Sequence, residues 1–536
     1  MSRYSPEEAA LLSRYVSNLD RNVYAIWGLP EEVIAVVFAR VSRSPASFRD
    51  NLLSLIRDRE LALASPDGEG PPPEARFDLE KARRFHERVV IGYGHSSVAE
   101  LAVAHVGIER ISRLASARLE LANPFLSFVE YSQRYQRPAR GGYVVPPELE
   151  ERPDLRGAFE QLQDETYRAY EELQAGLVDY LRGVIGPREG EGEKAWRSRL
   201  EKIAFEDARY ALTLAVHTNL GLTGNGRALR DAIVRLLSDP YPECRRLAAA
   251  MREEVSAVLP VLLRHAEESP YQTQTRLAFE AELGDLGSWA PRGAEATRSS
   301  ASGAAGPRAA VLLDWTGRDG TAPEAGPARD AAPAGDSIPP DEVRALRTLL
   351  EGALTTHSRL GGEALRRHVA DLPADRLVRL ARVLVDRLGP HDHPHDAFHR
   401  VAYEVEFCVS EACWHQLLRH SRKVDFAPAE PRPDDGWVVP PNVRAAGLEG
   451  VLARAVEASE ALYRRLLADA PLAAPYVLTG AHRRRARARF DLWELYHLVN
   501  LRGGPEAQWE IREAILDLNE QVRRVHPHLA PTRRRA

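Results

Sequence analysis

The segment SFVEYSQRYQRP, residues Ser127–Pro138, combines side chains that bind anions. Ser132 and Arg134 stand on either side of Gln133, and a proline closes the segment. A serine hydroxyl, nearby backbone amides and the planar fork of a guanidinium together suit a phosphate group. The alternative is that Arg134 simply pairs with a surface carboxylate. The first hypothesis predicts a phosphorylated ligand at this segment.

A second segment, CWHQLLRHSRK at Cys413–Lys423, ends an apolar stretch with side chains of the same kind. Gln416 and Arg419 are three residues apart, so they share one face of a predicted helix, and His420 follows directly. An amide beside a guanidinium suits an anionic nucleotide. A cation near a helix C-terminus is also stabilising by itself, which leaves a purely structural role open.

The turn GYGHSSVAEL, residues Gly92–Leu101, places three polar side chains where an apolar segment begins. His95, Ser97 and Glu100 are therefore candidates for contact with a ligand. Ser97 and Glu100 are also three residues apart, as in a capping box at the start of a helix. Both interpretations remain open on the spacing.

Four further basic or amide side chains are candidates for contact with a ligand. Arg209 lies in DARYAL, and Asn225 and Arg227 lie in TGNGRAL. Asn225 before a glycine also fits an ordinary helix N-cap and turn. Arg502 precedes two glycines, at the end of one predicted helix and before the next. Arginine followed by glycine is also a common way to end a helix.

Other site chemistries have weaker support. The segment HDHPHDAFH carries His391, His393, His395 and His399, which are residue types that bind zinc. A proline interrupts them and no matching Cys or His set stands elsewhere, so we expect no metal site. The sequence contains no Gly-rich phosphate loop of the GxGxxG or GxxxxGK[ST] form and no GxSxG elbow. Neither sequence nor spacing supports a cysteine nucleophile.

The composition is that of a globular protein. Of 536 residues, 44% are apolar and 28% charged, and the formal net charge of -5 gives no bulk positive field for nucleic acid. Three cysteines are too few for a disulfide framework and fit a reducing compartment. The N-terminus has no apolar signal core, and no apolar run reaches transmembrane length. We therefore expect a cytoplasmic protein that binds neither nucleic acid nor membrane.

The two halves of the chain look alike. GYVVPPEL at Gly142–Leu149 has a counterpart in GWVVPPNV at Gly436–Val443, and each follows a polar loop. Each half also ends in a helical pattern, GRALRDAIVRLL in the first and LWELYHLVNLR in the second. A duplication with strong drift explains these pairs.

Composition and pattern also predict boundaries and fold class. A Gly-, Ala-, Pro- and Ser-rich linker at 286–307 separates a domain at 1–285 from one at 308–536. The runs AVAHVGIE, AYEVEFCVS and AAVLLDWTG are predicted strands, and helical patterns dominate elsewhere. The predicted class is α+β, or mixed α/β, helix-rich with short antiparallel sheets.

Together these blocks resemble the flavin-dependent thymidylate synthases. The first half carries GHSSVAEL, GIERISRLASARLE and LSFVEYSQRY, where the family has a GHxSxxEH turn, a helix ending in RHR and an SxRY loop. The second half carries FCVSEACWHQLLRH and NLRGGPEAQWEIREA. The resemblance covers most of both halves outside the linker, and it implies two tandem synthase-like domains.

The resemblance implies an enzyme that converts dUMP to dTMP with FAD, NADPH and 5,10-methylenetetrahydrofolate. Members of the family are homotetramers whose sites are assembled from several subunits. Reduced flavin does the reductive chemistry, protein arginines bind and polarise the nucleotide, and no enzyme nucleophile attacks the uracil. The scarcity of cysteines agrees with this.

The resemblance also assigns residues. Arg502 matches the arginine that polarises the pyrimidine, and it is the catalytic candidate. The nucleotide-binding positions are matched by Glu130, Ser132, Gln133, Arg134, Arg209, Gln416 and Arg419. The positions near the flavin are matched by Ser42, His95, Ser97, Glu100, Asn225, Arg227, Arg419 and His420.

Each half departs from the family pattern in a different place. In the first half the RHR position reads ANP at Ala122–Pro124, and the late arginine falls at about Leu236. In the second half the SxRY position lies around Asp425–Glu430, and the family's NAR motif reads DLW at Asp491–Trp493. The phosphate arginine there falls at Pro475. Each half thus keeps what the other has lost.

This complementarity predicts composite sites. The two halves would form a pseudo-dimer and two chains a pseudo-tetramer, that is, a homodimer with fewer complete sites than the family tetramer. The alternatives are a degenerate paralogue that binds nucleotide or flavin without catalysis, a non-enzymatic partner of a separate synthase, and a flavoenzyme acting on another pyrimidine nucleotide.

Overall fold

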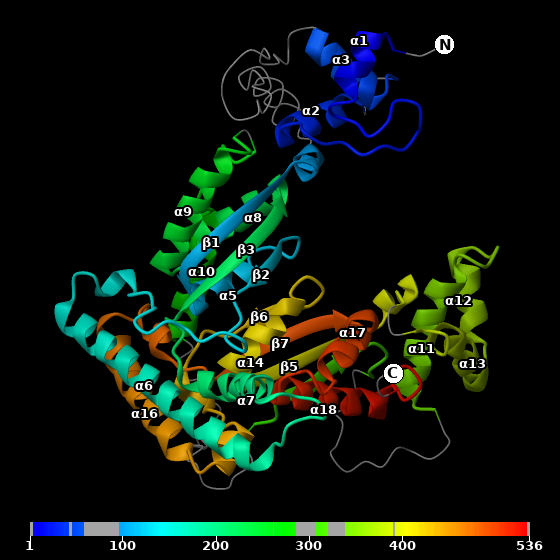
Figure 1. Cartoon of the computed structure of the whole chain (residues 1–536). Helices are drawn as coiled ribbons and strands as arrows, with labels where there is room; N and C mark the ends of the chain where they lie inside the picture. The colour runs from blue at the N-terminus through cyan, green and yellow to red at the C-terminus, as the bar shows by residue number, and fades with distance from the viewer. Residues whose placement is uncertain are drawn as a thin grey trace. The chain divides into compact units, whose positions relative to one another are not determined.

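The computed structural model describes residues 4–41, 45–57, 96–260, 262–285, 307–319, 338–389 and 392–532, and the chain divides into two compact units (Figure 1). Unit 1 comprises Met1–Ile111, Arg118–Tyr131 and His217–Ala290. Unit 2 comprises Ser112–Ala117, Ser132–Val216 and Pro291–Ala536. Among the described helices, none combines the length and apolarity that crossing a bilayer requires. Most of the predicted linker lies outside the described residues.

Unit 1 contains a small sheet and helices from both ends of the first half. Its antiparallel strands β2 and β3 pair from Ser127↔Thr223 to Glu130↔Leu220, and the strand order is β1-β3-β2. Alternate residues of β3 are buried, as expected for a strand with one covered face. Its elements are α1 (Pro6–Leu12), α2 (Glu31–Val41), α3 (Phe48–Arg57), η2 (Ser96–Leu101), β1 (Val103–Ser112), β2 (Ser127–Glu130), β3 (His217–Asn225), α8 (Gly226–Leu237), α9 (Pro242–Ser256) and α10 (Pro270–Asp285). Helix α5 (Arg113–Glu120) begins in unit 2 and ends in unit 1.

Unit 2 is built around a four-stranded antiparallel sheet of order β4-β5-β7-β6. Its strands are β4 (Ala310–Trp315), β5 (Ala402–Ser410), β6 (Asp425–Pro428) and β7 (Arg483–Asp491). Its α-helices are α6 (Pro153–Val184), α7 (Glu193–Ala208), α11 (Pro340–Leu354), α12 (Gly362–Ala370), α13 (Ala374–Val385), α14 (Glu411–Leu417), α15 (Pro441–Ala445), α16 (Glu449–Asp469), α17 (Leu492–Arg502) and α18 (Trp509–Val525). Single 3-10 turns are η3 (Pro147–Leu149), η4 (Arg209–Ala211), η5 (Asp396–Arg400), η6 (Leu418–His420), η7 (Pro433–Asp435) and η8 (Ala474–Val477).

The three predicted strands and both predicted terminal helices are present, and the α+β class with short antiparallel sheets is confirmed. Strand β7 shows why RRRARARFD is a strand despite its charge. Arg484 is buried with Ala486 and Ala488 on one face, and the arginines between them point to the other face. The Arg484 Nε lies 2.8 Å from Oε1 of the buried Glu411, so its charge is paired.

Equivalent segments of the two halves pair with each other inside unit 2. Long helices α6 and α16, which follow the two VVPP motifs, lie side by side and share an apolar core (Figure 1). RYALTLAVH (209–217) and PYVLTGAH (475–482) run antiparallel and meet at Thr213↔Thr479. The Leu214 amide donates to the Leu478 carbonyl at 2.8 Å and the Gly480 amide to the Leu212 carbonyl at 2.7 Å. In a two-fold dimer the same segment of each subunit meets at the interface. Pairing of equivalent segments is therefore expected if the two halves of a duplicated chain keep the interface of an ancestral dimer.

Buried Asp207, the penultimate residue of α7, makes the stability of unit 2 depend on pH. It accepts hydrogen bonds from Asn442 Nδ2 at 2.8 Å and Trp509 Nε1 at 3.1 Å. Burial raises its pKa from 3.8 to about 6, although the two hydrogen bonds act in the opposite direction. The folded state therefore binds this proton more tightly than the unfolded state does. As the pH rises from about 4 through about 6, the Asp207 carboxyl must ionise while buried, and the protein loses stability.

We expect Asp207→Asn to remove this pH dependence of stability, because asparagine does not titrate. From pH 4 to pH 7 the free energy of unfolding of the variant should rise relative to that of the wild type, by up to about 3 kcal/mol. Loss of one acceptor oxygen adds an offset that does not depend on pH. Urea unfolding at both pH values measures the difference, with Asp179→Asn on the exposed face of α6 as the control. A difference that stays constant with pH would contradict the assignment.

Candidate functional site

Most of the candidate nucleotide-binding residues lie in unit 2. Ser132, Gln133 and Arg134 follow β2 in the chain, and Arg209 is the first residue of η4. From the second half come Gln416 on α14, Arg419 and His420 on η6, and Arg502 as the last residue of α17. Glu130 belongs to unit 1, where it is buried and accepts a hydrogen bond from the Thr218 hydroxyl at 2.9 Å.

Arg134 joins the first half to the second. Its Nε lies 2.5 Å from Oε2 of Glu206 on α7, and its Nη2 donates to the backbone carbonyl of Glu506 at 3.3 Å. Glu506 lies in the loop between α17 and α18. The predicted alternative of a carboxylate partner for Arg134 is thus present, but the partner lies beside second-half residues. The neighbouring Gln133 is buried, and its Nε2 has no hydrogen-bond partner among the described residues.

Arg209 is also held by residues of both halves. It is only 5% exposed. Its Nε donates to the backbone carbonyl of Glu206 at 3.1 Å, and its Nη2 donates to that of Ala412 at 3.3 Å. The guanidinium is therefore fixed by one backbone oxygen near the end of α7 and one at the start of α14.

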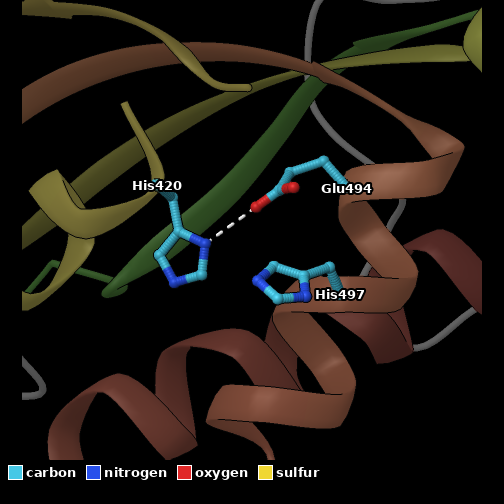
Figure 2. Close-up of side chains that lie close together, drawn as sticks. All are labelled: His420, Glu494 and His497. Carbon is cyan, nitrogen blue, oxygen red and sulfur yellow. Dashed lines mark hydrogen bonds and ion pairs between the residues drawn. The ribbon is translucent and has the colours of Figure 1, made fainter. Parts of the chain in front are cut away.

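Arg502 lies against the segment that contains the other second-half candidates. Its Nε donates to Nε2 of His420 at 3.0 Å, and its Nη2 donates to the Gln416 carbonyl at 3.4 Å. Nδ1 of His420 lies 2.7 Å from Oε1 of Glu494 on α17, as Figure 2 shows. Gln416 in turn donates from Nε2 to Oε1 of Gln508 at 3.4 Å, and its Oε1 has no partner among the described residues.

A buried polar network connects these groups to the first half. The Tyr210 hydroxyl, next to Arg209, donates to Oε2 of Glu510 at 2.6 Å, and Gln508 Nε2 donates to the same hydroxyl at 2.9 Å. Glu510 also accepts from the backbone amide of Ser410 at 2.7 Å. Because each member is buried and bonded to the next, the network fixes the relative positions of η4, α14 and α18.

Several arginines of the candidate nucleotide site lie close enough to act on one another's charge. Burial lowers the pKa of Arg502, and the charges of Arg134 and Arg419 lower it further. Burial likewise lowers the pKa of Arg209, with Arg134 and Arg113 acting in the same direction and Tyr210 and Glu206 opposing them. Guanidiniums that destabilise one another favour a bound anion, because its charge relieves their repulsion.

His415 is a member of this region that the sequence reasoning missed. It is 5% exposed, and neither ring nitrogen has a hydrogen-bond partner among the described residues. Burial lowers its pKa well below the ordinary value, and the charges of Arg113 and Arg484 lower it further. A neutral imidazole between arginines retains an N–H donor for a buried ligand. Nothing in the sequence CWHQLLRH distinguishes it from an ordinary core histidine.

Glu494 and His497 were also missed. Glu494 is 1% exposed, and His497 lies three residues further along α17. One potential ligand atom from each of His420, Glu494 and His497 lies within 4.8 Å of the other two (Figure 2). Burial and the charge of Arg502 lower the pKa of His420 to about 3, whereas burial raises the pKa of Glu494 to about 7. The ExxH spacing was the only sequence signal, and it does not identify His420 as the third member.

Unit 1 contains the first-half members of the predicted flavin set that the structure describes. Asn225 caps α8, accepting from the Ala228 amide at 2.8 Å, as the capping alternative predicted. Nη1 of Arg227 lies 2.7 Å from Oε1 of Glu100, and both side chains are about half exposed. An accessible guanidinium in the first turn of a 12-residue helix suits a flavin phosphate. Ser97 lies in η2, and Ser42 and His95 fall outside the described residues.

The equivalent place in the second half is filled differently. Asp491 caps α17, accepting from the Glu494 amide at 2.9 Å, as Asn225 caps α8. Where the family's motif has arginine, Trp493 stacks with His399 at 4.5 Å between ring centroids. Nζ of Lys423 lies 4.0 Å from the centroid of the indole ring. An aromatic side chain that packs on a histidine and a lysine thus stands at the position that the resemblance gives to an arginine.

Both halves of the chain match one family of known proteins. The family described as "Thymidylate synthase complementing protein" matches residues 29–261 and 352–528. A "UPF0159 protein" of Chlamydia muridarum is 25% identical over 98% of this chain and 94% of its own length. A "UPF0159 protein" of Thermoplasma acidophilum is 23% identical over 85% of this chain and 89% of its own length. A "Flavin-dependent thymidylate synthase" of Mycobacterium sp. (strain KMS) is 36% identical over 36% of this chain and 73% of its own length. The chain therefore belongs to the thymidylate synthase complementing protein family, the flavin-dependent thymidylate synthases, as a tandem duplication of the family domain.

Proposed function

We propose that this protein converts dUMP to dTMP with FAD, NADPH and 5,10-methylenetetrahydrofolate, at a composite site built from both halves. The observation that supports the proposal most is the convergence of complementary arginines in unit 2. Arg134 and Arg209 come from the first half and Arg502 from the second, and the charge of Arg134 lowers the pKa of both others. Each half lacks family residues that the other half keeps, and these three arginines are among the residues that are kept.

The nucleotide would be held by its phosphate. Arg134 and Arg209 supply guanidinium donors, with Ser132 and Gln416 as neutral donors beside them. Glu206, which now pairs with Arg134, would share that guanidinium with the phosphate. Glu130 and Gln133 complete the set carried over from the family. Because Arg209 is fixed by backbone carbonyls, it would bind phosphate without a large change in conformation.

Arg502 would act on the pyrimidine ring. A guanidinium donates hydrogen bonds to a uracil oxygen and stabilises the negative charge that develops when the base is activated. Arg419 and His420 would lie against the flavin. The other flavin positions that the resemblance assigns are Ser42, His95, Ser97, Glu100, Asn225 and Arg227, and they belong to unit 1. Reduced flavin supplies the reducing equivalents when bound. The protein supplies orientation, which lowers the entropic part of the barrier.

The duplication also bears on the assembly of the protein. It suggests two domains, at 1–285 and 308–536, and a homodimer that acts as a pseudo-tetramer. The protein would meet dUMP and reduced folate in the cytoplasm. Two observations favour a second candidate, a protein that binds nucleotide without catalysis. Trp493 stands at one position where the resemblance expects an arginine, and Glu206 already pairs with Arg134.

Visible absorption of the purified protein separates the two candidates. The proposal predicts an oxidised-flavin spectrum, and anaerobic NADPH should bleach it faster when dUMP is present. The same experiment with dCMP controls for a general effect of a pyrimidine nucleotide. A colourless protein that binds dUMP but cannot be reconstituted with FAD would favour the non-catalytic candidate and contradict the synthase.

A further inference from the structure

Three side chains of unit 2 form a hydrogen-bonded chain that ends on the candidate catalytic arginine. Oε1 of Glu494 lies 2.7 Å from Nδ1 of His420, and Nε2 of His420 lies 3.0 Å from Nε of Arg502. Glu494 is 1% exposed and His420 4%. Figure 2 shows the carboxylate of Glu494 pointing from α17 to the imidazole.

The donors and acceptors of this chain fix the position of a proton. The Nε of arginine carries a hydrogen and can only donate, so Nε2 of His420 must accept with its lone pair. Nδ1 then carries the proton of the neutral ring, and it donates to Glu494. A carboxyl oxygen can accept this hydrogen bond whether the group is ionised or protonated, so Glu494 favours this tautomer and the orientation of the ring. Glu494 therefore acts on Arg502 through His420.

A metal ion is the competing interpretation, because His497 brings a third ligand atom to within 4.8 Å of those of His420 and Glu494. A cation bound at Nδ1 would put the proton of His420 on Nε2, facing the N–H of Arg502. The charges of Lys423 and Arg502 act on Glu494 and would repel a cation, while the charge of Asp491 acts in the opposite direction. The observed hydrogen bonds therefore favour the proton-bearing chain.

We infer that Glu494 is a positioning residue: by fixing the Nδ1–H tautomer of His420 it holds the guanidinium of Arg502 at the pyrimidine subsite. The inference rests on the proposed function for the role of Arg502. Glu494 touches neither nucleotide nor flavin in this account. Its effect is expected on turnover more than on binding, since Arg502 acts on charge that develops in the transition state.

The first test does not depend on activity. In protein labelled with ¹⁵N at histidine and arginine, we expect His420 to be neutral with its proton on Nδ1. We also expect the Arg502 Nε–H to exchange slowly with water. In Glu494→Met, which removes the acceptor with little change in volume, this exchange should become faster. Glu494→Gln retains an acceptor oxygen and should be intermediate. An Nε2–H tautomer in the wild type, or unchanged exchange in Glu494→Met, would overturn the inference.

The second test uses turnover, with His497→Asn as the matched control on the same helix. Glu494→Met should lower kcat on the order of 10- to 100-fold, with a much smaller change in the Kd for dUMP. Glu494→Gln should recover part of kcat, and His497→Asn should leave it near the wild-type value. If His497→Asn loses as much as Glu494→Met, and added Zn²⁺ or EDTA changes the histidine spectra, the site binds metal and the inference fails. A wild type that makes no dTMP but shows the Nδ1–H tautomer and slow exchange would contradict the proposed function alone.

Discussion

Replacing Arg502 with alanine is expected to lower kcat for dTMP formation on the order of 10²- to 10³-fold. Arg502 is the guanidinium that would stabilise negative charge on the pyrimidine, and it is held by His420 and the Gln416 carbonyl. Lysine should not restore the rate, because a single ammonium cannot reproduce the planar fork. The measurement is the initial rate of dTMP formation at saturating dUMP, with bound FAD quantified from the spectrum.

The control for this prediction is Arg523→Ala, which removes an exposed arginine from the last turn of α18. It should leave both the rate and the flavin content unchanged. If Arg502→Ala instead kept most of its activity, Arg502 would be a helix C-terminal arginine of structural value only. A loss of activity that came with loss of bound FAD would point to the cofactor rather than to the pyrimidine.

The second large effect is expected from Arg134, and it tests where the composite site is assembled. Arg134→Ala should lower kcat/KM for dUMP about 100-fold, because a charge-assisted hydrogen bond to phosphate is lost. Arg134 contacts the Glu506 carbonyl within unit 2, and its charge acts on Arg502 of the same chain. Mixing Arg134→Ala with Arg502→Ala protein, after dissociation and reassembly, should therefore recover no activity.

Recovery of a substantial fraction of activity on mixing would contradict this prediction. It would mean that Arg134 of one chain completes a site with Arg502 of another, as between subunits in the family tetramer. Full activity in either single variant would remove the composite site altogether. Arg137→Ala, an exposed arginine that pairs with Glu171, is the matched control near Arg134.

The sequence predicted local features well and contacts between distant segments less well. The strand at 402–410 could be predicted from its alternating apolar residues and the strand at 310–315 from its short apolar run. Helix α8 could be predicted because its apolar period of 3.6 is strong. The nucleotide residues were found from residue type and resemblance. Glu494 was not found, because its role depends on His420, which lies 74 residues away in the chain. His415 was not found, because only the structure shows that it is buried without a hydrogen-bond partner among the described residues.

The pairing of the two halves illustrates the same limit. The repeated VVPP motifs indicated a duplication, but no sequence pattern shows that 210–215 and 476–481 form main-chain hydrogen bonds with each other. These bonds depend on tertiary packing of α6 against α16, which local propensity does not encode. The predicted capping role of Asn225 was confirmed, and its flavin-binding role stays a prediction.

The most direct test of the central claim is the formation of dTMP itself. Purified wild-type protein is incubated anaerobically with dUMP, FAD, NADPH and 5,10-methylenetetrahydrofolate, and the nucleotides are separated and identified by mass. The account predicts dTMP in the wild-type reaction, none without the folate or NADPH, and a severe loss with Arg502→Ala. A wild-type protein that holds FAD and dUMP at full occupancy but forms no dTMP would contradict it.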